Sequence, residues 1–155
     1  MKTLDTRDLY KRKCELEELK EAIETAQEEL KEHMEAEPTL ADDDYEEAYA
    51  TWEEEKEEFE SAVDQAEYLF GTDEQEELSE LEEIEGYASD FKGGETMIPT
   101  HSFKEYAQLF ADDIGAINRD ATWPLNCINW DEAAEELAMD YSQVTYQGQD
   151  YYVRS

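Results

Sequence analysis

The sequence predicts a mainly helical α+β protein, in which an N-terminal antiparallel helical hairpin precedes an α-helical module that ends in a C-terminal β-hairpin. Three observations predict this fold class. Apolar residues repeat every seven positions through residues 1–70, helix-capping patterns recur between residues 72 and 139, and alternating residues flank a glycine-containing turn near the end. We therefore assign residues 1–70 to a coiled-coil-like hairpin and residues 71–155 to an acidic α+β module.

The first helix is expected over about residues 5–35. Its main apolar positions are seven residues apart, at Leu9, Leu16, Ile23 and Leu30. Such a stripe, flanked by charge, is typical of a helix that packs along its length against another helix. Pro38 then predicts a break, because proline interrupts helical hydrogen bonding.

The second helix is expected from the aspartates at 42–44, which can cap it, to about Phe70. Its largest apolar side chains again recur every seven residues, at Tyr45, Trp52, Phe59 and Ala66. Two helices joined by a short loop should pack antiparallel.

Gly71 closes this hairpin, and Thr72 with Gln75 forms a capping-box pattern that predicts a third helix. This helix is expected to run to the Gly93-Gly94 pair. Its buried face would consist of Leu78, Leu81, Ile84, Tyr87, Ala88 and Phe91.

A fourth helix is predicted after Pro99, with Ser102 and Glu105 as its cap and Gly115 at its end. Its inward residues would be Phe103, Tyr106, Ala107, Phe110 and Ile114. After a loop over residues 118–126, Asn129 and Glu132 predict a fifth helix through Met139. Alternation in residues 142–146 and 150–154, around Gln147-Gly148-Gln149, predicts the β-hairpin.

The net charge of the chain limits the kinds of partner that it can bind. The chain has 45 acidic and 12 basic residues, a net charge of −33, yet 12% of it is aromatic, which favours a folded rather than a disordered chain. Such a surface repels nucleic acid and anionic membranes. The sequence contains no long apolar run and no signal-peptide pattern, so we expect a location in the cytoplasm, where Cys14 and Cys127 would be free thiols.

The negative charge is concentrated in residues 37–90, which hold 23 acidic residues and one base, Lys56, for a net charge of −22. One predicted row comprises Glu46, Glu53, Glu57 and Glu60, and a parallel row comprises Glu54, Glu58 and Asp64. Carboxylates three or four residues apart on a helix lie about 5–6 Å from one another, a spacing comparable with that of DNA phosphates.

These rows predict a polyanion-mimicking surface that binds a basic site on a partner protein. We predict that its carboxylates are those of Asp42, Asp43, Asp44, Glu46, Glu47, Glu53, Glu54, Glu57, Glu58, Glu60, Asp64, Glu74, Glu77, Glu80, Glu82 and Glu85. Two simpler interpretations stay open. The acids could form an ordinary solvated helix face, or they could reflect adaptation to high salt, which would spread charge over every surface.

Enzymatic chemistry is not predicted. The sequence lacks the phosphate-binding glycine motifs, the nucleophile-elbow motif and the EF-hand pattern, so we expect no catalytic residues, no cofactor and no metal site. His33 is expected beside the hairpin seam and His101 just before a helix cap, neither with zinc-ligand spacing. Cys127 is expected to be a small buried hydrophobe.

The C-terminal residues carry a family resemblance. The segment from Asn129 to Leu137 (NWDEAAEEL), then Asp140-Tyr141, Val144, Gly148 and Tyr152-Val153-Arg154 are similar to the end of ArdA-type antirestriction proteins of phages and plasmids. The resemblance covers about the last 30 residues, and the β-rich N-terminal region of that family is replaced here by a helical hairpin. It implies a mobile-element protein that imitates DNA and blocks a host Type I restriction enzyme.

The charge pattern and the resemblance together predict an anti-defence DNA mimic. The expected partner is a basic DNA-binding protein or nuclease complex of the host, either a restriction enzyme or a CRISPR effector, whose DNA channel the carboxylates would occupy. The alternative is an acidic coiled-coil adaptor or chaperone for a basic protein, with the hairpin forming a homodimer. A metal-dependent hydrolase is the weakest interpretation.

Overall fold

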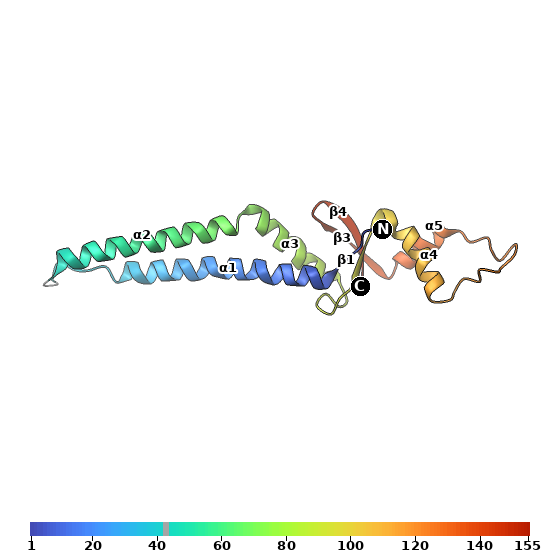
Figure 1. The fold of residues 1–155 in the computed structure, drawn as a ribbon, viewed down its shortest axis with the longest axis horizontal. Coiled ribbons are helices and arrows are strands. Elements are labelled where there is room, and N and C mark those ends of the chain that lie inside the picture. Colours follow the sequence, from blue (N-terminus) through green and yellow to red (C-terminus); the bar gives the residue numbers. More distant parts are fainter. Residues whose placement is uncertain (42–43) are drawn as a thin grey trace. The chain divides into compact units, whose positions relative to one another are not determined.

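A computed structural model of the chain describes residues 1–41 and 44–155. In these residues the fold is mainly helical α+β, as the sequence predicts, with five α-helices and one four-stranded antiparallel sheet (Figure 1). The chain divides into two compact units. One comprises residues 14–78, and the other comprises residues 1–13 together with residues 79–155. The first 13 residues, which the sequence alone placed with the hairpin, lie in the latter unit.

The unit of residues 14–78 is the helical hairpin. Helix α1 spans Thr6–Glu35 and helix α2 spans Tyr45–Leu69, and the two run antiparallel (Figure 1). Leu16 is fully buried, and Ala26 and Trp52 are 8% and 7% exposed, so the seven-residue repeats do form the seam. The prediction of an antiparallel hairpin is confirmed.

The seam is more regular than its apolar residues indicate. In α2 the side chains that are not fully exposed follow a strict alternation of four and three residues, at positions 45, 49, 52, 56, 59, 63 and 66. Lys56, the single base of residues 37–90, occupies one of these positions. Its ammonium lies 5.7 Å from the centroid of the Trp52 ring and 3.6 Å from the Glu60 carboxylate. Lys56 therefore contributes to the seam through a cation–π contact.

His33 lies in the seam near the end of α1. Its ring stacks on Trp52 at 5.4 Å and lies 5.0 Å from the ring of Phe59. The Trp52 indole donates to the His33 carbonyl at 2.9 Å, and Nε2 of His33 donates to the Trp52 carbonyl at 2.8 Å. These reciprocal hydrogen bonds fix the register of the two helices at this level.

The turn from α2 into helix α3 (Thr72–Tyr87) is capped differently from the prediction. The carboxylate of Glu74 accepts a hydrogen bond from the Gly71 amide at 3.0 Å. This is the contact that a capping box makes between its N-cap amide and the side chain three residues later, so the pair is Gly71 with Glu74 and not Thr72 with Gln75. At the start of α2, Asp44 is the N-cap residue as predicted, but its side chain makes no capping hydrogen bond. Its backbone, with φ −110° and ψ 33°, is outside the extended conformation that brings a cap side chain to the helix.

Helix α3 ends at Tyr87 and does not reach the predicted Gly93-Gly94 terminus. The Ser89 amide donates to the Arg154 carbonyl at 2.9 Å, and the Gly93 amide donates to the Asp90 carboxylate at 2.7 Å. A local aspartate acceptor of this kind competes with helical hydrogen bonding and turns the chain. Tyr87, predicted to be buried, is 48% exposed.

The second unit contains the sheet, in the order β1-β2-β4-β3. Its strands are β1 (Leu4–Asp5), β2 (Thr96–Pro99), β3 (Tyr141–Tyr146) and β4 (Gln149–Arg154). The predicted C-terminal hairpin is confirmed, and Gln147 and Gly148 both have positive φ, as a two-residue hairpin turn requires. Strands β1 and β2 were not predicted. The core is formed by Leu81, Ile84, Met97, Ile98 and Val153, all fully buried.

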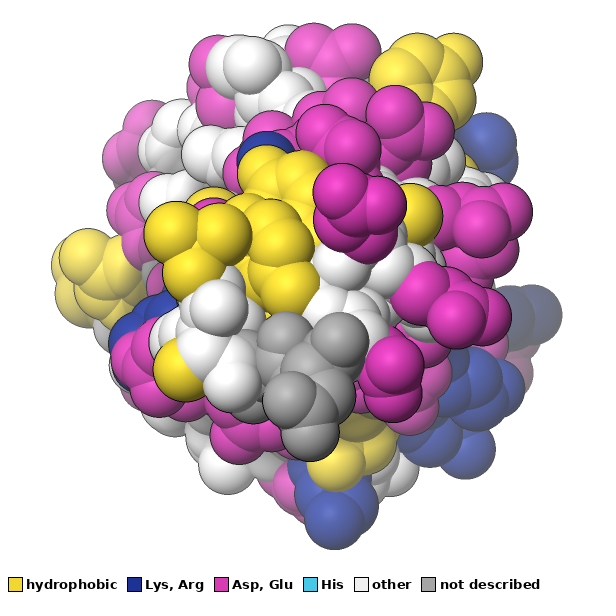
Figure 2. Space-filling model, turned by 90° about the vertical axis from the view of Figure 1, so that its left-hand side faces the viewer, with side chains coloured by type: hydrophobic (Ala, Val, Ile, Leu, Met, Phe, Trp, Pro, Cys, Tyr) yellow, Lys and Arg dark blue, Asp and Glu magenta, His cyan; other side chains and the backbone are white. Residues whose placement is uncertain are grey.

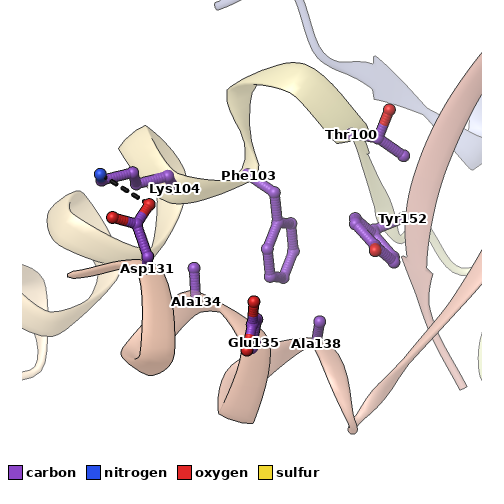
Figure 3. A pocket seen from close by; sticks show the side chains of 8 residues that line it. All are labelled: Thr100, Phe103, Lys104, Asp131, Ala134, Glu135, Ala138 and Tyr152. Carbon is purple, nitrogen blue, oxygen red and sulfur yellow. Dashed lines mark hydrogen bonds and ion pairs between the residues drawn. The ribbon is translucent and has the colours of Figure 1, made fainter. Parts of the chain in front are cut away.

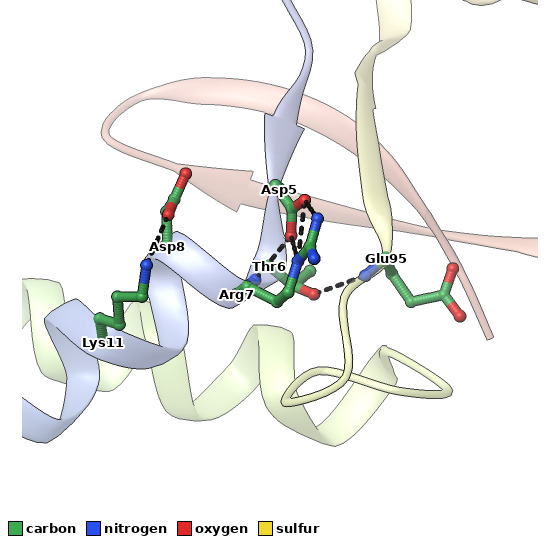
Figure 4. A network of polar contacts seen from close by, with 6 residues as sticks. All are labelled: Asp5, Thr6, Arg7, Asp8, Lys11 and Glu95. Atoms are coloured by element: carbon green, nitrogen blue, oxygen red, sulfur yellow. Dashed lines mark hydrogen bonds and ion pairs between the residues drawn. The ribbon is translucent and has the colours of Figure 1, made fainter.

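Thr6 and Glu95 join the start of α1 to β2 (Figure 4). The Thr6 amide donates to the Glu95 carbonyl at 2.9 Å, and the Glu95 amide donates to the buried Thr6 hydroxyl at 2.7 Å. Asp5 accepts from the Arg7 amide at 2.9 Å and also from the Arg7 side chain. The hydrogen bonds from Arg7 lower the pKa of Asp5 to about 2, so this carboxylate stays charged at the beginning of α1.

Helix α4 (Phe103–Asp113) and helix α5 (Trp130–Ala138) complete this unit, with the single 3-10 turn Thr100–Ser102 before α4. Asn129 caps α5 as predicted, accepting from the amides of Asp131 and Glu132. Ser102 makes no side-chain cap, because the 3-10 turn already fixes its backbone at φ −105° and ψ 2°.

Two burial predictions in this region are wrong. Ile114 is 62% exposed, because it is the C-cap residue after the last helical residue of α4 and the helical periodicity no longer applies to it. Cys127 is exposed, since it belongs to the connection between α4 and α5, and connecting segments run over the surface.

Candidate partner-binding surface

The predicted carboxylates of α2 all lie on its solvent-facing side. The heptad places the seam on one stripe of the helix and leaves the remaining positions to polar residues. Exposed side chains in this set are Asp44, Glu46, Glu47, Glu53, Glu54, Glu57, Glu58, Glu60 and Asp64. Asp42 and Asp43, which belong to the same prediction, lie outside the described residues. The local sequence therefore forms an acidic face as a direct consequence of how it packs.

The rows on α2 follow from helix geometry. Glu46, Glu53, Glu57 and Glu60 are separated by seven, four and three residues, which keeps them on one side of the helix. Asp64, placed in the second row on sequence grounds, is seven residues after Glu57 and continues the first row. That row extends over 18 residues, or about 27 Å along the helix axis.

Most of these carboxylates have no partner in the fold. Within residues 1–41 and 44–155, no hydrogen bond or ion pair engages the side chains of Glu53, Glu54, Glu57, Glu58 and Asp64. Glu60 is the exception, through Lys56 at 3.6 Å. Like charges four residues apart, as in Glu53 with Glu57 and Glu54 with Glu58, destabilise a helix by a few tenths of a kcal/mol per pair. The acidic face is therefore not explained by the stability of the hairpin.

The predicted carboxylates of α3 are placed differently. Glu74 accepts from the Gly71 amide, Glu80 accepts from the Gln147 amide at 2.9 Å, and Glu85 pairs with Lys13 at 3.0 Å. Glu77 is half-buried and also has a partner. Glu82 is exposed. The sequence predicted the same partner-binding role for the α2 and α3 carboxylates. In the structure, most of these α3 carboxylates instead accept hydrogen bonds or form ion pairs within the fold.

The charge density of the hairpin approaches that of duplex DNA. Residues 16–35 of α1 and residues 45–69 of α2 contain 18 acidic and 3 basic residues, a net charge of −15, and all 18 acids are exposed. Helix α2 has 25 residues and is about 37 Å long, so the hairpin carries about one net negative charge per 2.5 Å. Duplex DNA carries one per about 1.7 Å.

The end of the hairpin combines acidic and apolar groups. Figure 2 views the end at which α1 stops and α2 starts, where a group of hydrophobic side chains lies beside acidic ones. Among the apolar residues near this end, Met34 is 41% and Leu40 is 85% exposed. The rings of Tyr45 and Tyr49 lie 5.6 Å apart, and Tyr49 lies 5.5 Å from Trp52. Such a patch can add desolvated contacts to an electrostatic interface.

Across the described ranges, no group of three His, Cys, Asp or Glu side chains is arranged to hold a metal ion. His33 packs in the hairpin seam, and His101 is exposed in the turn before α4. No helix in residues 1–41 or 44–155 has both the length and the apolar character needed to cross a bilayer.

Comparisons with protein-family models, with curated proteins and with solved structures gave no match to this chain. The similarity of residues 129–154 to ArdA-type proteins therefore stays a prediction from those residues. The carboxylate geometry of the hairpin is the structural feature that bears on function.

Proposed function

We propose that this protein is an anti-defence inhibitor that imitates DNA and acts in the cytoplasm of the host cell. Its hairpin occupies the basic DNA channel of a host defence complex, either a restriction enzyme or a CRISPR effector. The observation that carries the proposal is the set of unpartnered carboxylates on α2, on a hairpin with about one net charge per 2.5 Å.

Inhibition is competitive in this mechanism. A channel lined with Lys and Arg attracts the hairpin over a distance set by the ionic strength and then pairs with its carboxylates. The helix backbone that carries the α2 carboxylates is positioned by the seam, which the His33–Trp52 contacts fix, so the channel does not have to order that backbone. The apolar group at the hairpin end adds contacts that do not depend on salt.

The α2 carboxylates can be tested by neutralising four of them without changing side-chain shape. The quadruple variant replaces Glu53, Glu54, Glu57 and Glu58 with Gln. Exposed ion pairs contribute about 0.2–1 kcal/mol each, so this variant should lose about 1–4 kcal/mol of binding to a purified Type I restriction enzyme or CRISPR effector. Cleavage of a DNA substrate measures the corresponding loss of inhibition.

A matched control changes the net charge by the same amount elsewhere. It carries Glu105→Gln, Asp113→Asn, Glu132→Gln and Glu136→Gln, all at exposed positions of the other unit. The control should inhibit like the wild type. If both variants lose inhibition equally, total charge rather than the α2 surface is responsible, and if neither loses inhibition, the α2 carboxylates do not contribute; either result contradicts the proposal.

Binding and cleavage assays on the wild-type chain separate DNA mimicry from the adaptor alternative. An acidic adaptor for a basic protein would bind histone-like proteins and leave DNA cleavage by the nuclease unchanged. The apolar stripe that would support a coiled-coil homodimer is already used between α1 and α2. Light scattering of the full chain should therefore report a monomer under the proposed mechanism.

A further inference from the structure

A second candidate site lies in the other unit, far along the sequence from the α2 carboxylates. It is a pocket of about 370 Å³ between the start of α4, helix α5 and strand β4 (Figure 3). Its lining residues are Thr100, Phe103, Lys104, Asp131, Ala134, Glu135, Ala138 and Tyr152. This volume is near the lower end of the range for ligand pockets, which suits a single side chain better than a large ligand.

Helix α5 forms one wall of the pocket, and the small side chains on this face leave space in front of it. Asp131, Ala134, Glu135 and Ala138 are spaced by three, one and three residues, so they share one face of the helix. The two alanines have no atoms beyond Cβ, and the space between α5 and the aromatic side chains therefore stays unfilled. The Asn129 cap fixes the first turn of this helix.

Two aromatic rings provide the opposite wall. The rings of Phe103 and Tyr152 lie 4.5 Å apart at an interplanar angle of 54°. Phe103 is 4% exposed and also contacts the ring of Tyr141 at 5.2 Å, so it is held in place. Tyr152 is only partly buried and presents ring surface to the pocket (Figure 3).

The pocket is lined by two carboxylates and one cation. Lys104 and Asp131 form an ion pair at 2.7 Å, which leaves the cation of the pocket already matched (Figure 3). Glu135 is exposed, and no hydrogen bond or ion pair engages its side chain within the described residues. In a chain of net charge −33, an aromatic wall beside an unmatched carboxylate attracts cations and repels anions.

We infer that this pocket binds an arginine side chain of a partner protein. A guanidinium is planar, stacks on an aromatic face and donates two parallel N–H hydrogen bonds to a carboxylate, so Tyr152 and Glu135 together match both of its properties. A lysine ammonium can also lie over an aromatic ring, but it is not planar and cannot make the two-point contact with the carboxylate. The inference stands on the pocket and does not depend on the α2 carboxylates or on DNA mimicry.

The test uses two capped amino acids that differ in charge but hardly in shape. Nα-acetyl-arginine methylamide and its citrulline counterpart are titrated into the full chain, and the methyl NMR signals of Ala134 and Ala138 are followed. Ala48 and Ala62 on α2 serve as reporters of general attraction to the acidic hairpin. We expect saturable shifts at Ala134 and Ala138 with the arginine compound, and at least fivefold weaker binding of the citrulline compound.

Two substitutions locate the site. Glu135→Gln should weaken arginine binding about fivefold, whereas Glu136→Gln, an equal charge change on the neighbouring residue outside the pocket, should change it less than twofold. Ala134→Leu should fill the pocket and abolish the shifts at Ala138 while leaving the fold intact by circular dichroism. Equal binding of citrulline, or equal effects of the two Gln variants, overturns the inference, as does the absence of saturable shifts at Ala134 and Ala138. Because no defence enzyme is present, none of these results bears on the proposed inhibition.

Discussion

Trp52 is the residue whose removal most sharply tests the structure of the hairpin. It is 7% exposed, stacks on His33, lies beneath the ammonium of Lys56 and donates a hydrogen bond to the His33 carbonyl. Trp52→Ala removes all of these contacts at one level of the seam. The carboxylate rows on α2 depend on the same seam for their orientation.

The expected loss of stability follows from the buried area. An aromatic side chain buries about 150–250 Å², which at about 25 cal/mol per Å² corresponds to about 4–6 kcal/mol. Compactness of the unfolded chain reduces this value by about 10–40%. We therefore expect Trp52→Ala to lower the free energy of unfolding of the hairpin by about 3–5 kcal/mol, in the range of measured Trp→Ala substitutions in cores.

Urea unfolding followed by far-ultraviolet circular dichroism measures this loss, because the hairpin contributes much of the helical signal. Tyr68→Ala is the matched control, since Tyr68 is an aromatic residue of the same helix and is 84% exposed. It should change the free energy of unfolding by less than about 0.5 kcal/mol. A loss below about 1 kcal/mol for Trp52→Ala, or equal losses for the two variants, would show that Trp52 is not packed in a seam between α1 and α2.

Three further predictions concern the other unit and the whole chain. Asn129→Ala should cost about 1 kcal/mol of unfolding free energy, because two α5 amides lose their acceptor, and Asn129→Ser should restore most of it in urea unfolding. Burial and the 3.0 Å hydrogen bond with Tyr106 raise the pKa of Tyr141, so the folded protein keeps a proton that the unfolded chain releases above about pH 10. The stability that protonated Tyr141 gives the folded protein is therefore complete below about pH 10 and is lost as the pH rises further. Tyr141→Phe should remove this decline from a curve of unfolding free energy against pH. Finally, Tm should rise between about 10 mM and 150 mM NaCl, because salt screens the self-repulsion of 45 acidic residues; a fall in Tm contradicts this account.

The hairpin was predictable because its information is local and periodic. Leu16 and Trp52 belong to seven-residue repeats that can be read directly from the chain, and both are buried where the repeats place them. The C-terminal β-hairpin was predictable for the same reason, since alternation and a Gln147-Gly148 turn lie within 14 residues.

Elements that depend on distant partners were not predictable. Strand β1 has two residues, and it is a strand only because Leu4 and Asp5 pair with Met97 and Thr96, more than 90 residues away. The early end of α3 has a similar origin, since the Ser89 amide leaves the helix to bond the Arg154 carbonyl. Neither partner can be identified from the local sequence.

The candidate partner-binding surface was also predictable only in part. Exposure of Glu53 and Glu57 follows from the heptad, because positions that are not in the seam face solvent. The contacts of Glu80 with the Gln147 amide and of Glu85 with Lys13 required the three-dimensional arrangement. The pocket beside Phe103 was also missed, although Ala134 and Ala138, four residues apart on a short acidic helix, could have indicated a helix face with space above it.

Displacement of DNA tests the central claim most directly. A fluorescent duplex bound to a purified Type I restriction enzyme, or to a CRISPR effector, is titrated with the full chain, and anisotropy reports how much duplex stays bound. Mimicry predicts complete displacement, an apparent affinity that falls in proportion as the duplex concentration is raised, and weaker binding as salt increases. A ternary complex that retains the duplex, or displacement that is insensitive to both salt and the four α2 Glu→Gln substitutions, would contradict it.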